Sequence, residues 1–186
     1  MIVTQVHQRD VVDVLLAQHE EIKALFSRVA AAQGDRKREQ FYDLVRLLAV
    51  HESAEEQLVH PAARKAIGEG NERIVDERLH EEAEAKRTLS DLYDLGVDHP
   101  EFNDRLTLLA ENVVAHATNE EREEFPLLRS HVGPERLQRM ASVFEAAEQA
   151  APTRPHPSAG ESATANIVFG PPLALFDKVR DALRKS

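Results

Sequence analysis

The chain has 186 residues, of which 42% are hydrophobic and 30% charged, with a formal net charge of −10 and no cysteine. This length predicts one domain with an appendage, because domains average roughly 150 residues. The lack of cysteine excludes disulfides, iron–sulfur clusters and cysteine-ligated zinc sites, and the acidic balance argues against a nucleic-acid-binding surface.

The first two predicted elements are amphipathic helices over residues 10–33 and 36–66. Their apolar residues recur every three or four positions, which is the helical period. Gly34 ends the first helix and begins the connection to the second. Pro61 lies inside the second helix, where it should kink or locally interrupt it.

Two further long helices are predicted over residues 72–95 and 101–130, and the second of them contains Pro126 as its counterpart contains Pro61. A break at Gly133–Pro134 precedes a shorter helix that runs to about residue 150. Long amphipathic helices joined by short loops pack as antiparallel neighbours. The expected fold is therefore all-α: an up-down-up-down four-helix bundle with an extra short helix and a C-terminal helical tail.

The predicted domain organisation follows from a change in composition after the bundle. Residues 1–150 form the bundle, and residues 151–166, rich in Pro, Ser and Ala, form a linker. Residues 167–186 predict a tail helix with one apolar face, which docks either on its own bundle or on a partner. We therefore expect a monomer or a weak homodimer.

A repeat within the bundle carries the chemistry. Residues 51–61 read HESAEEQLVHP and residues 116–126 read HATNEEREEFP, so His-x-x-x-Glu occurs twice, each time before a proline. The first helix of each hairpin adds one histidine. Two such hairpins about a pseudo-twofold axis should bring together His19, His51, Glu55, His80, His116 and Glu120.

The residue types at this spacing favour a pair of metal ions. Residues four apart on a helix differ by about 40° in direction, so a His and a Glu can address neighbouring points. Buried carboxylates are costly unless they are paired or bind a metal. A mixed nitrogen and oxygen ligand set with vacant positions indicates non-haem iron rather than tetrahedral zinc.

This order of motifs resembles the hemerythrin-like, or HHE cation-binding, family over about residues 10 to 130, and within it the actinobacterial branch. The resemblance implies a bundle that holds two non-haem iron ions with an oxo or hydroxo bridge on the six residues above. It also implies handling of hydrogen peroxide, nitric oxide or dioxygen.

Two departures from oxygen-carrying hemerythrins stand out. Glu84 occupies the second place of their third-helix His-x-x-x-His, and His116 and Glu120 are four apart where those proteins space His and Asp by five. Such a site is harder and more anionic and should favour ferric iron, which favours peroxide or nitric oxide chemistry over reversible dioxygen carriage. Glu84 is expected to act as a proton relay or extra ligand, with a solvated charge or a hydrogen bond to a ligand imidazole as the alternative.

Two other groups are expected to lie outside the site. His60 lies about 180° around an ideal helix from His51, so it should face away unless Pro61 distorts the turn. The acidic run over residues 120–124 should be a solvated face with Glu120 as its one inward member.

The leading functional hypothesis is a di-iron protein that binds and turns over a small oxidant, as a catalase-like or peroxidase-type oxidoreductase. The alternatives are a non-catalytic module that binds, stores or senses dioxygen, nitric oxide or iron, and a bundle whose role is protein contact. The N-terminus has no signal-peptide pattern and no apolar run approaches the roughly 18 residues of a membrane span. We therefore expect a cytoplasmic protein with neither a membrane nor a nucleic-acid partner.

Overall fold

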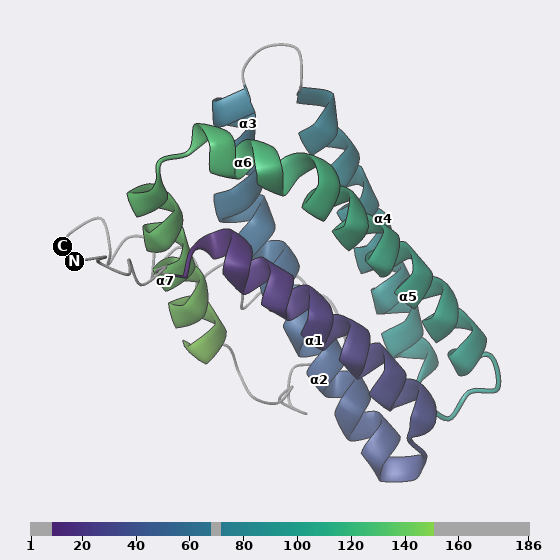
Figure 1. The fold of residues 1–186 in the computed structure, drawn as a ribbon. Coiled ribbons are helices and arrows are strands. Elements are labelled where there is room, and N and C mark those ends of the chain that lie inside the picture. The colour runs from purple at the N-terminus through teal and green to yellow at the C-terminus, as the bar shows by residue number, and fades with distance from the viewer. Residues whose placement is uncertain (1–8, 68–71, 151–186) are drawn as a thin grey trace.

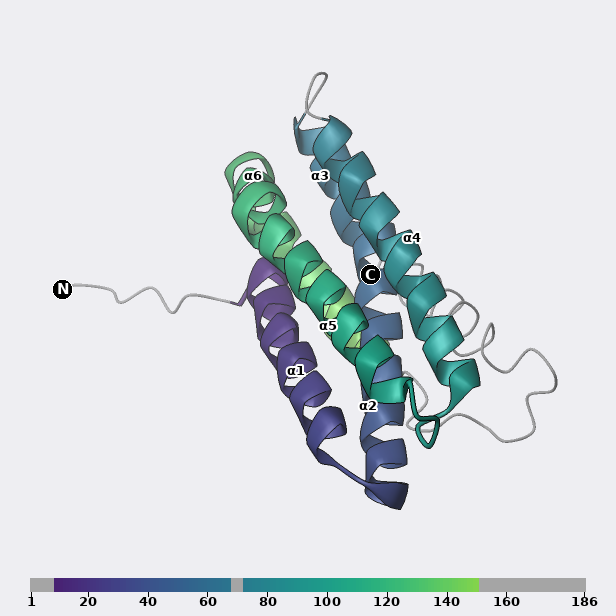
Figure 2. The same ribbon diagram turned by 90° about the vertical axis from the view of Figure 1, so that its right-hand side faces the viewer.

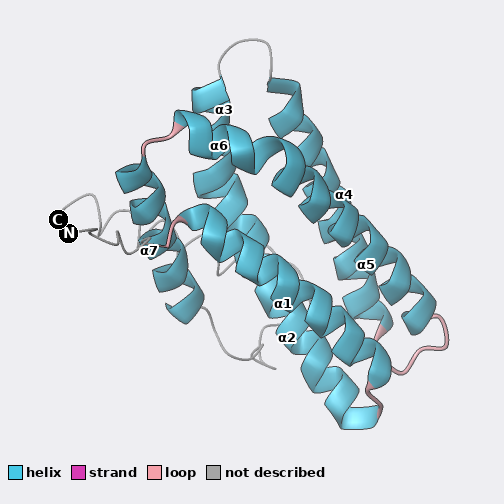
Figure 3. Ribbon diagram, in the orientation of Figure 1, coloured by secondary structure: helices cyan, strands magenta, loops and turns pink. Residues whose placement is uncertain are grey.

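The structure is a computed structural model that describes residues 9–67 and 72–150 (Figure 1). Every regular element of the described residues is a helix (Figure 3), which confirms the predicted all-α fold. No helix in these ranges is both long and apolar enough to cross a membrane. The predicted linker 151–166 and tail 167–186 lie outside the described residues.

The bundle consists of four helical rods, whose arrangement can be followed in Figure 2. The first hairpin pairs α1 with a composite rod, and the second hairpin pairs α4 with another composite rod. The elements of the first hairpin are α1 (Val11–Ala31), α2 (Gly34–Ala54), η1 (Glu55–Val59) and α3 (His60–Ile67). Those of the second are α4 (Glu72–Leu95), α5 (Phe102–Asn119), η2 (Glu120–Glu124) and α6 (Phe125–His131).

The shorter helix predicted after the Gly133–Pro134 break is α7 (Pro134–Ala150), which packs against α1 and α2. A second contact ties the start of α1 to α6. Asp10 caps α1 through a capping box with Asp13, and the guanidinium of Arg129 donates hydrogen bonds to both carboxylates. The end of the second hairpin is thus fixed to the beginning of the first.

The apolar core divides into two clusters, one toward each end of the bundle. The cluster at the α7 end includes Leu15, Phe125 and Phe144, and the cluster at the opposite end includes Ile22 and Phe102. Along α1, His19 lies between Leu15 of one cluster and Ile22 of the other. The interior between the two clusters is polar, and this is where the candidate site lies.

Each composite rod contains a widened, π-helical turn at the same place in the repeat. The N–H of His60 donates to the carbonyl of Glu55, and the N–H of Phe125 donates to the carbonyl of Glu120, five residues back instead of four. The next residue in both rods is a proline, which has no N–H and would clash with a carbonyl four residues earlier in an ordinary helix. Widening the turn before the proline relieves that clash, so the predicted local interruption at Pro61 is confirmed.

Candidate metal centre

Five of the six predicted residues converge in the polar layer, each of them at least nine-tenths buried. His19 comes from the middle of α1, His51 and His116 come from the ends of α2 and α5, and Glu55 and Glu120 open the two π-helical turns. The two carboxylates are completely buried. The hairpin repeat therefore places its His-x-x-x-Glu pairs face to face.

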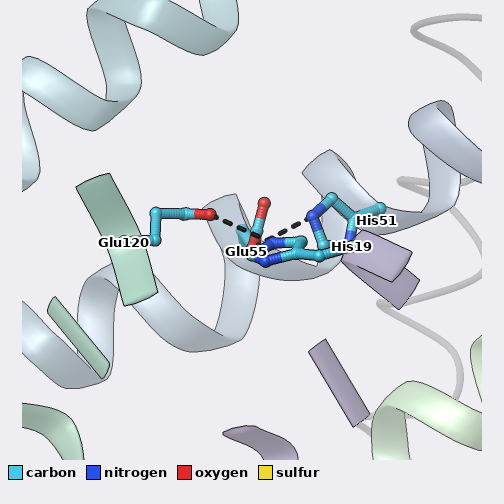
Figure 4. Close-up of side chains that lie close together, drawn as sticks. All are labelled: His19, His51, Glu55 and Glu120. Atoms are coloured by element: carbon cyan, nitrogen blue, oxygen red, sulfur yellow. Dashed lines mark ion pairs between the residues drawn. The ribbon is translucent and has the colours of Figure 1, made fainter. Parts of the chain in front are cut away.

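One group of donors consists of His19, His51, Glu55 and Glu120, which point toward one another in Figure 4. Nε2 of His51 lies 3.3 Å from Oε1 of Glu55, and Nε2 of His19 lies 3.4 Å from Oε2 of Glu120. One donor atom from each of the four residues lies within 4.8 Å of all the others. This spacing allows a single cation to contact all four side chains.

A second group shares both glutamates with the first. It consists of Glu55, Glu82, His116 and Glu120, again with one donor atom from each within 4.8 Å of the others. Nε2 of His116 lies 3.4 Å from Oε1 of Glu120. Because Glu55 and Glu120 belong to both groups, they are placed to bridge two cations.

The prediction that His80 enters the interior is wrong. Its side chain is 72% exposed, and its Nε2 lies 3.5 Å from Oε1 of Glu84, which is also exposed. The inward stripe of α4 runs through Val75, Arg78, Glu82, Ala85, Leu89 and Leu92. His80 lies two positions, or about 200°, from both Arg78 and Glu82, so it points outward. Glu84 shares this outer face and lies outside the cluster as well.

Glu82 takes the place in α4 that His19 takes in α1. The inward residues Leu15, His19, Ile22, Phe26 and Val29 match Arg78, Glu82, Ala85, Leu89 and Leu92 at a constant offset of 63. The His19–His80 pairing uses an offset of 61 and therefore follows sequence identity rather than packing. The signal in the sequence that could have identified Glu82 is its spacing of seven residues from both Val75 and Leu89, which places it on their face of the helix.

The prediction that His60 faces away is also wrong, and the π-helical turn is the reason. The turn adds one residue, so the angle between His51 and His60 falls from about 180° to about 80°. His60 is buried, with Nε2 2.5 Å from Glu82 Oε1 and Nδ1 2.9 Å from Glu124 Oε1. Glu124 is fully buried too, so Glu120 is not the only inward residue of the acidic run. Both ring nitrogens of His60 are engaged, which makes it a partner of carboxylates rather than a free donor.

The three histidines of the two groups are held from behind by hydrogen bonds. Each Nδ1 lies 2.8–2.9 Å from a side-chain oxygen: that of Glu121 for His19, Gln18 for His51 and Glu81 for His116. These bonds leave the lone pair of Nε2 facing inward. Metal-ligating histidines are commonly oriented in this way. Sequence spacing alone does not single out these three partners.

The inward-facing atoms lack the hydrogen bonds that buried polar atoms normally make. Among the described residues, Nε2 of His19 and His116 and both carboxylate oxygens of Glu55 and Glu120 are buried without a hydrogen-bond partner. Leaving such atoms unpaired is costly. Cations in contact with them would remove this cost, so the residues present fit a metal centre.

The electrostatics of the cluster also fit bound cations. Burial and the neighbouring charge of Glu120 raise the pKa of Glu55 well above its usual value. Burial acts in the same direction on Glu120, but His116 and His19 outweigh it and lower the pKa of that carboxyl to about 2. Glu82 and Glu124 add two further buried carboxyls. So much potential negative charge within a helical interior calls for positive charge beside it.

A small cavity of about 10 Å³ adjoins the cluster. His19, His51 and His116 line one side of it, and Ile22 and Val113 contribute apolar wall. This volume corresponds to about one water-sized molecule. Only a very small guest fits beside the donor atoms without movement of the walls.

Comparison with known proteins identifies the family. The family model of the hemerythrin HHE cation binding domain matches residues 10–128. An uncharacterized hemerythrin-like protein of Schizosaccharomyces pombe is 29% identical over 177 residues, which cover 93% of this chain and 86% of that protein. A DNA nickase of Nostoc sp. is 31% identical over 137 residues, or 73% of this chain, and the match spans only 38% of the nickase.

A solved structure shows the same fold. The crystal structure of a hemerythrin HHE cation binding domain-containing protein from Mycobacterium kansasii superposes with a TM-score of 0.67 at 20% identity, over 92% of this chain and 99% of that one. The family match covers the first three rods, most of the fourth and every residue of the two donor groups. The chain belongs to the hemerythrin HHE cation-binding family.

Proposed function

We propose that the chain is a non-haem di-iron protein that binds and turns over a small oxidant, with hydrogen peroxide as the preferred substrate. The observation that carries the proposal is the set of buried imidazole and carboxylate atoms that face one another without hydrogen-bond partners. The opposite nitrogen of each imidazole is already hydrogen-bonded, so the donors are oriented before any ion arrives.

The donor set favours iron over other common metals. Imidazole suits zinc, copper, nickel and iron, whereas carboxylate suits harder ions, and a site that mixes both suits iron. In this proposal His19 and His51 hold one ion, Glu82 and His116 hold the other, and Glu55 and Glu120 contact both. Membership of a cation-binding family supports the same assignment.

The protein's contribution to turnover is to bind, confine and orient the guest. The cavity beside the three histidines has room for about one water-sized molecule, which favours the smallest oxidants over larger ones. When bound, a pair of iron ions would relay two electrons between two peroxides: oxidation of one peroxide to dioxygen releases two electrons and two protons, which reduce the other to two waters. The apolar walls keep bulk water away from the reacting guest.

Iron reconstitution followed by peroxide addition tests the proposal. Purified chain loaded anaerobically with ferrous iron should bind two ions and should release dioxygen when peroxide is added, as measured with an oxygen electrode. His116→Ala should abolish dioxygen release, whereas His80→Ala, the same change on an exposed face, should leave it intact. Iron-loaded protein that leaves peroxide unconsumed would contradict turnover.

The same small cavity also favours a second candidate, reversible binding of dioxygen or nitric oxide without turnover. An optical spectrum that shifts with the gas and returns on its removal, together with no peroxide consumption, would establish this role. The DNA cleavage named for the Nostoc relative is not proposed, because the chain spans 38% of that protein and carries a net charge of −10.

A further inference from the structure

We propose that the two cation positions are chemically unequal, and that manganese, when offered together with iron, enters only the position built on Glu82 and His116. Iron then occupies the position built on His19 and His51, which gives an iron–manganese pair. This inference rests on the proposed metal binding at the same site, but it does not require the peroxide activity.

The inequality arises from three exchanges between the two halves of the repeat. The second rods match at an offset of 65 and the first rods at 63. At three matching places the residue beside the His19 position is less polar than its equivalent beside the Glu82 position. The pairs are His19 and Glu82, Phe125 and His60, and Val59 and Glu124.

The cation position that contains His19 is surrounded by apolar side chains. The ring of His19 stacks on that of Phe125, with centroids 5.6 Å apart and planes 18° from parallel. Phe125 and Val59 belong to one apolar cluster. An imidazole can rest against such a surface because its Nδ1 is already bonded to Glu121.

The cation position that contains Glu82 is instead surrounded by side chains that form hydrogen bonds. Oε1 of Glu82 lies 2.5 Å from Nε2 of His60, and Nδ1 of His60 lies 2.9 Å from Oε1 of Glu124. All three side chains are buried. A carboxylate could not rest on a phenyl ring without losing its solvation, so the change from His to Glu requires the change from Phe to His.

His60 is thus a positioning residue for Glu82 and leaves one carboxylate oxygen available. Oε2 of Glu82 accepts no hydrogen bond, and the nearest charged partner in the described residues is Nζ of Lys86 at 3.9 Å. Glu82 also lies in one donor group with His116. The oxygen that His60 does not hold is the one free to contact a cation.

The two positions consequently differ in donor type. Beyond the shared Glu55 and Glu120, one position has two imidazoles, whereas the other has one imidazole and one carboxylate. Imidazole donors favour iron, and oxygen donors suit manganese, so the preference for iron is weakest at the Glu82 position. Manganese should therefore compete there before it competes at the His19 position.

Two-wavelength anomalous diffraction measures this directly. Metal-free protein is loaded anaerobically with ferrous iron and a tenfold excess of manganese(II) and then crystallised. Difference maps at the iron and manganese absorption edges should place iron beside His19 and manganese beside Glu82. Manganese beside His19, an equal mixture at both positions or no bound manganese would each overturn the proposal.

Variants of Glu82 and of the two residues that surround it test which side chains set the metal preference. Glu82→His/His60→Phe/Glu124→Val makes the second half like the first, and its bound manganese should fall severalfold in favour of iron. Glu84→His, on the exposed face of the same helix, should keep the wild-type iron-to-manganese ratio. Should the triple variant fail to fold, Glu82→Gln keeps the shape and should lose manganese while retaining one iron, measured by elemental mass spectrometry.

Metal content distinguishes unequal cation positions from the absence of a metal centre. Wild-type protein that binds two irons and no manganese overturns only the unequal positions. Folded protein that binds neither ion overturns the metal centre itself, and with it the inference.

Discussion

The two hairpins share one motif in their second rods, whereas their first rods present different donor side chains to the interior. The rods that contain η1 and η2 repeat His-x-x-x-Glu, a π-helical turn and a proline at one constant offset. In contrast, α1 presents His19 to the interior where α4 presents Glu82. A pair of residues linked by helical spacing is a dependable guide to a site, because one turn fixes both directions, whereas a lone histidine is placed only by the burial stripe of its own helix.

The largest expected effect is at the glutamates that the two halves share. Glu55→Ala and Glu120→Ala should each remove both cations, since each carboxylate belongs to both donor groups. With ligand at a thousandfold over its dissociation constant, the lost stabilisation is about 4 kcal/mol for each cation. Calorimetry with and without iron measures it.

The sign of the Glu55 effect should reverse without metal. In metal-free protein, removal of a buried carboxylate relieves desolvation, so Glu55→Ala should be neutral or stabilising there. The exposed Glu84→Ala should change stability by less than about 0.5 kcal/mol in either state. Equal effects of Glu55→Ala with and without metal would contradict a role for this residue in cation binding.

The second-largest expected effect is the loss of the hydrogen bonds that His60 makes to Glu82 and Glu124. His60→Phe leaves Glu82 and Glu124 buried without their shared partner and should lower the free energy of unfolding by about 3 kcal/mol. The double change His60→Phe/Glu124→Val should recover part of that loss, because it restores the apolar pairing of the other half. Chemical denaturation measures both, and a double variant no more stable than the single one would refute the correspondence between the halves.

A pH titration sharpens the comparison of metal-free and metal-loaded protein. Burial raises the pKa of Glu52 from 4.5 to about 8, so this group favours the unfolded state increasingly as pH rises between these values. Burial opposes the charged form of His60, but hydrogen bonds to Glu124 and Glu82 outweigh it and raise the pKa from 6.5 to about 10. The stability that His60 contributes is present below pH 6.5 and is lost as pH rises toward 10.

Glu52 and His60 therefore both lower the stability of the metal-free protein as the pH rises from about 6.5 to 8. A nearby cation favours the deprotonated form of both groups, so the stabilisation by metal should grow over the same interval. The difference in melting temperature between loaded and metal-free protein should widen with pH. A difference that stays constant or narrows would contradict this electrostatic account.

The smallest effect concerns the residues behind the histidines. Glu121→Gln replaces the carboxylate bonded to His19 Nδ1 with an amide and should weaken metal binding about tenfold, mainly at the His19 position. Glu123→Gln, a neighbouring exposed change, is the control and should leave affinity unaltered. Competition with a chelator of known affinity measures the difference.

Most of the fold could be predicted from the sequence, since apolar period, glycines and prolines mark the rods and their ends. The structure brings His51 and Glu55 together with their counterparts in the repeat, because helical spacing ties each pair together. The prediction failed for His60 because an extra residue in the turn rotates everything that follows. It failed for Glu82 because a polar helix hides its inward stripe when apolar residues alone are followed.

The central claim is that a duplicated hairpin gathers buried imidazoles and carboxylates to bind two cations. Metal content of the purified chain after anaerobic iron loading, with folding verified by circular dichroism, is its most direct test. We expect two ions per chain in the wild type and none in folded Glu55→Ala protein. A folded wild-type chain that binds no ion would contradict the claim.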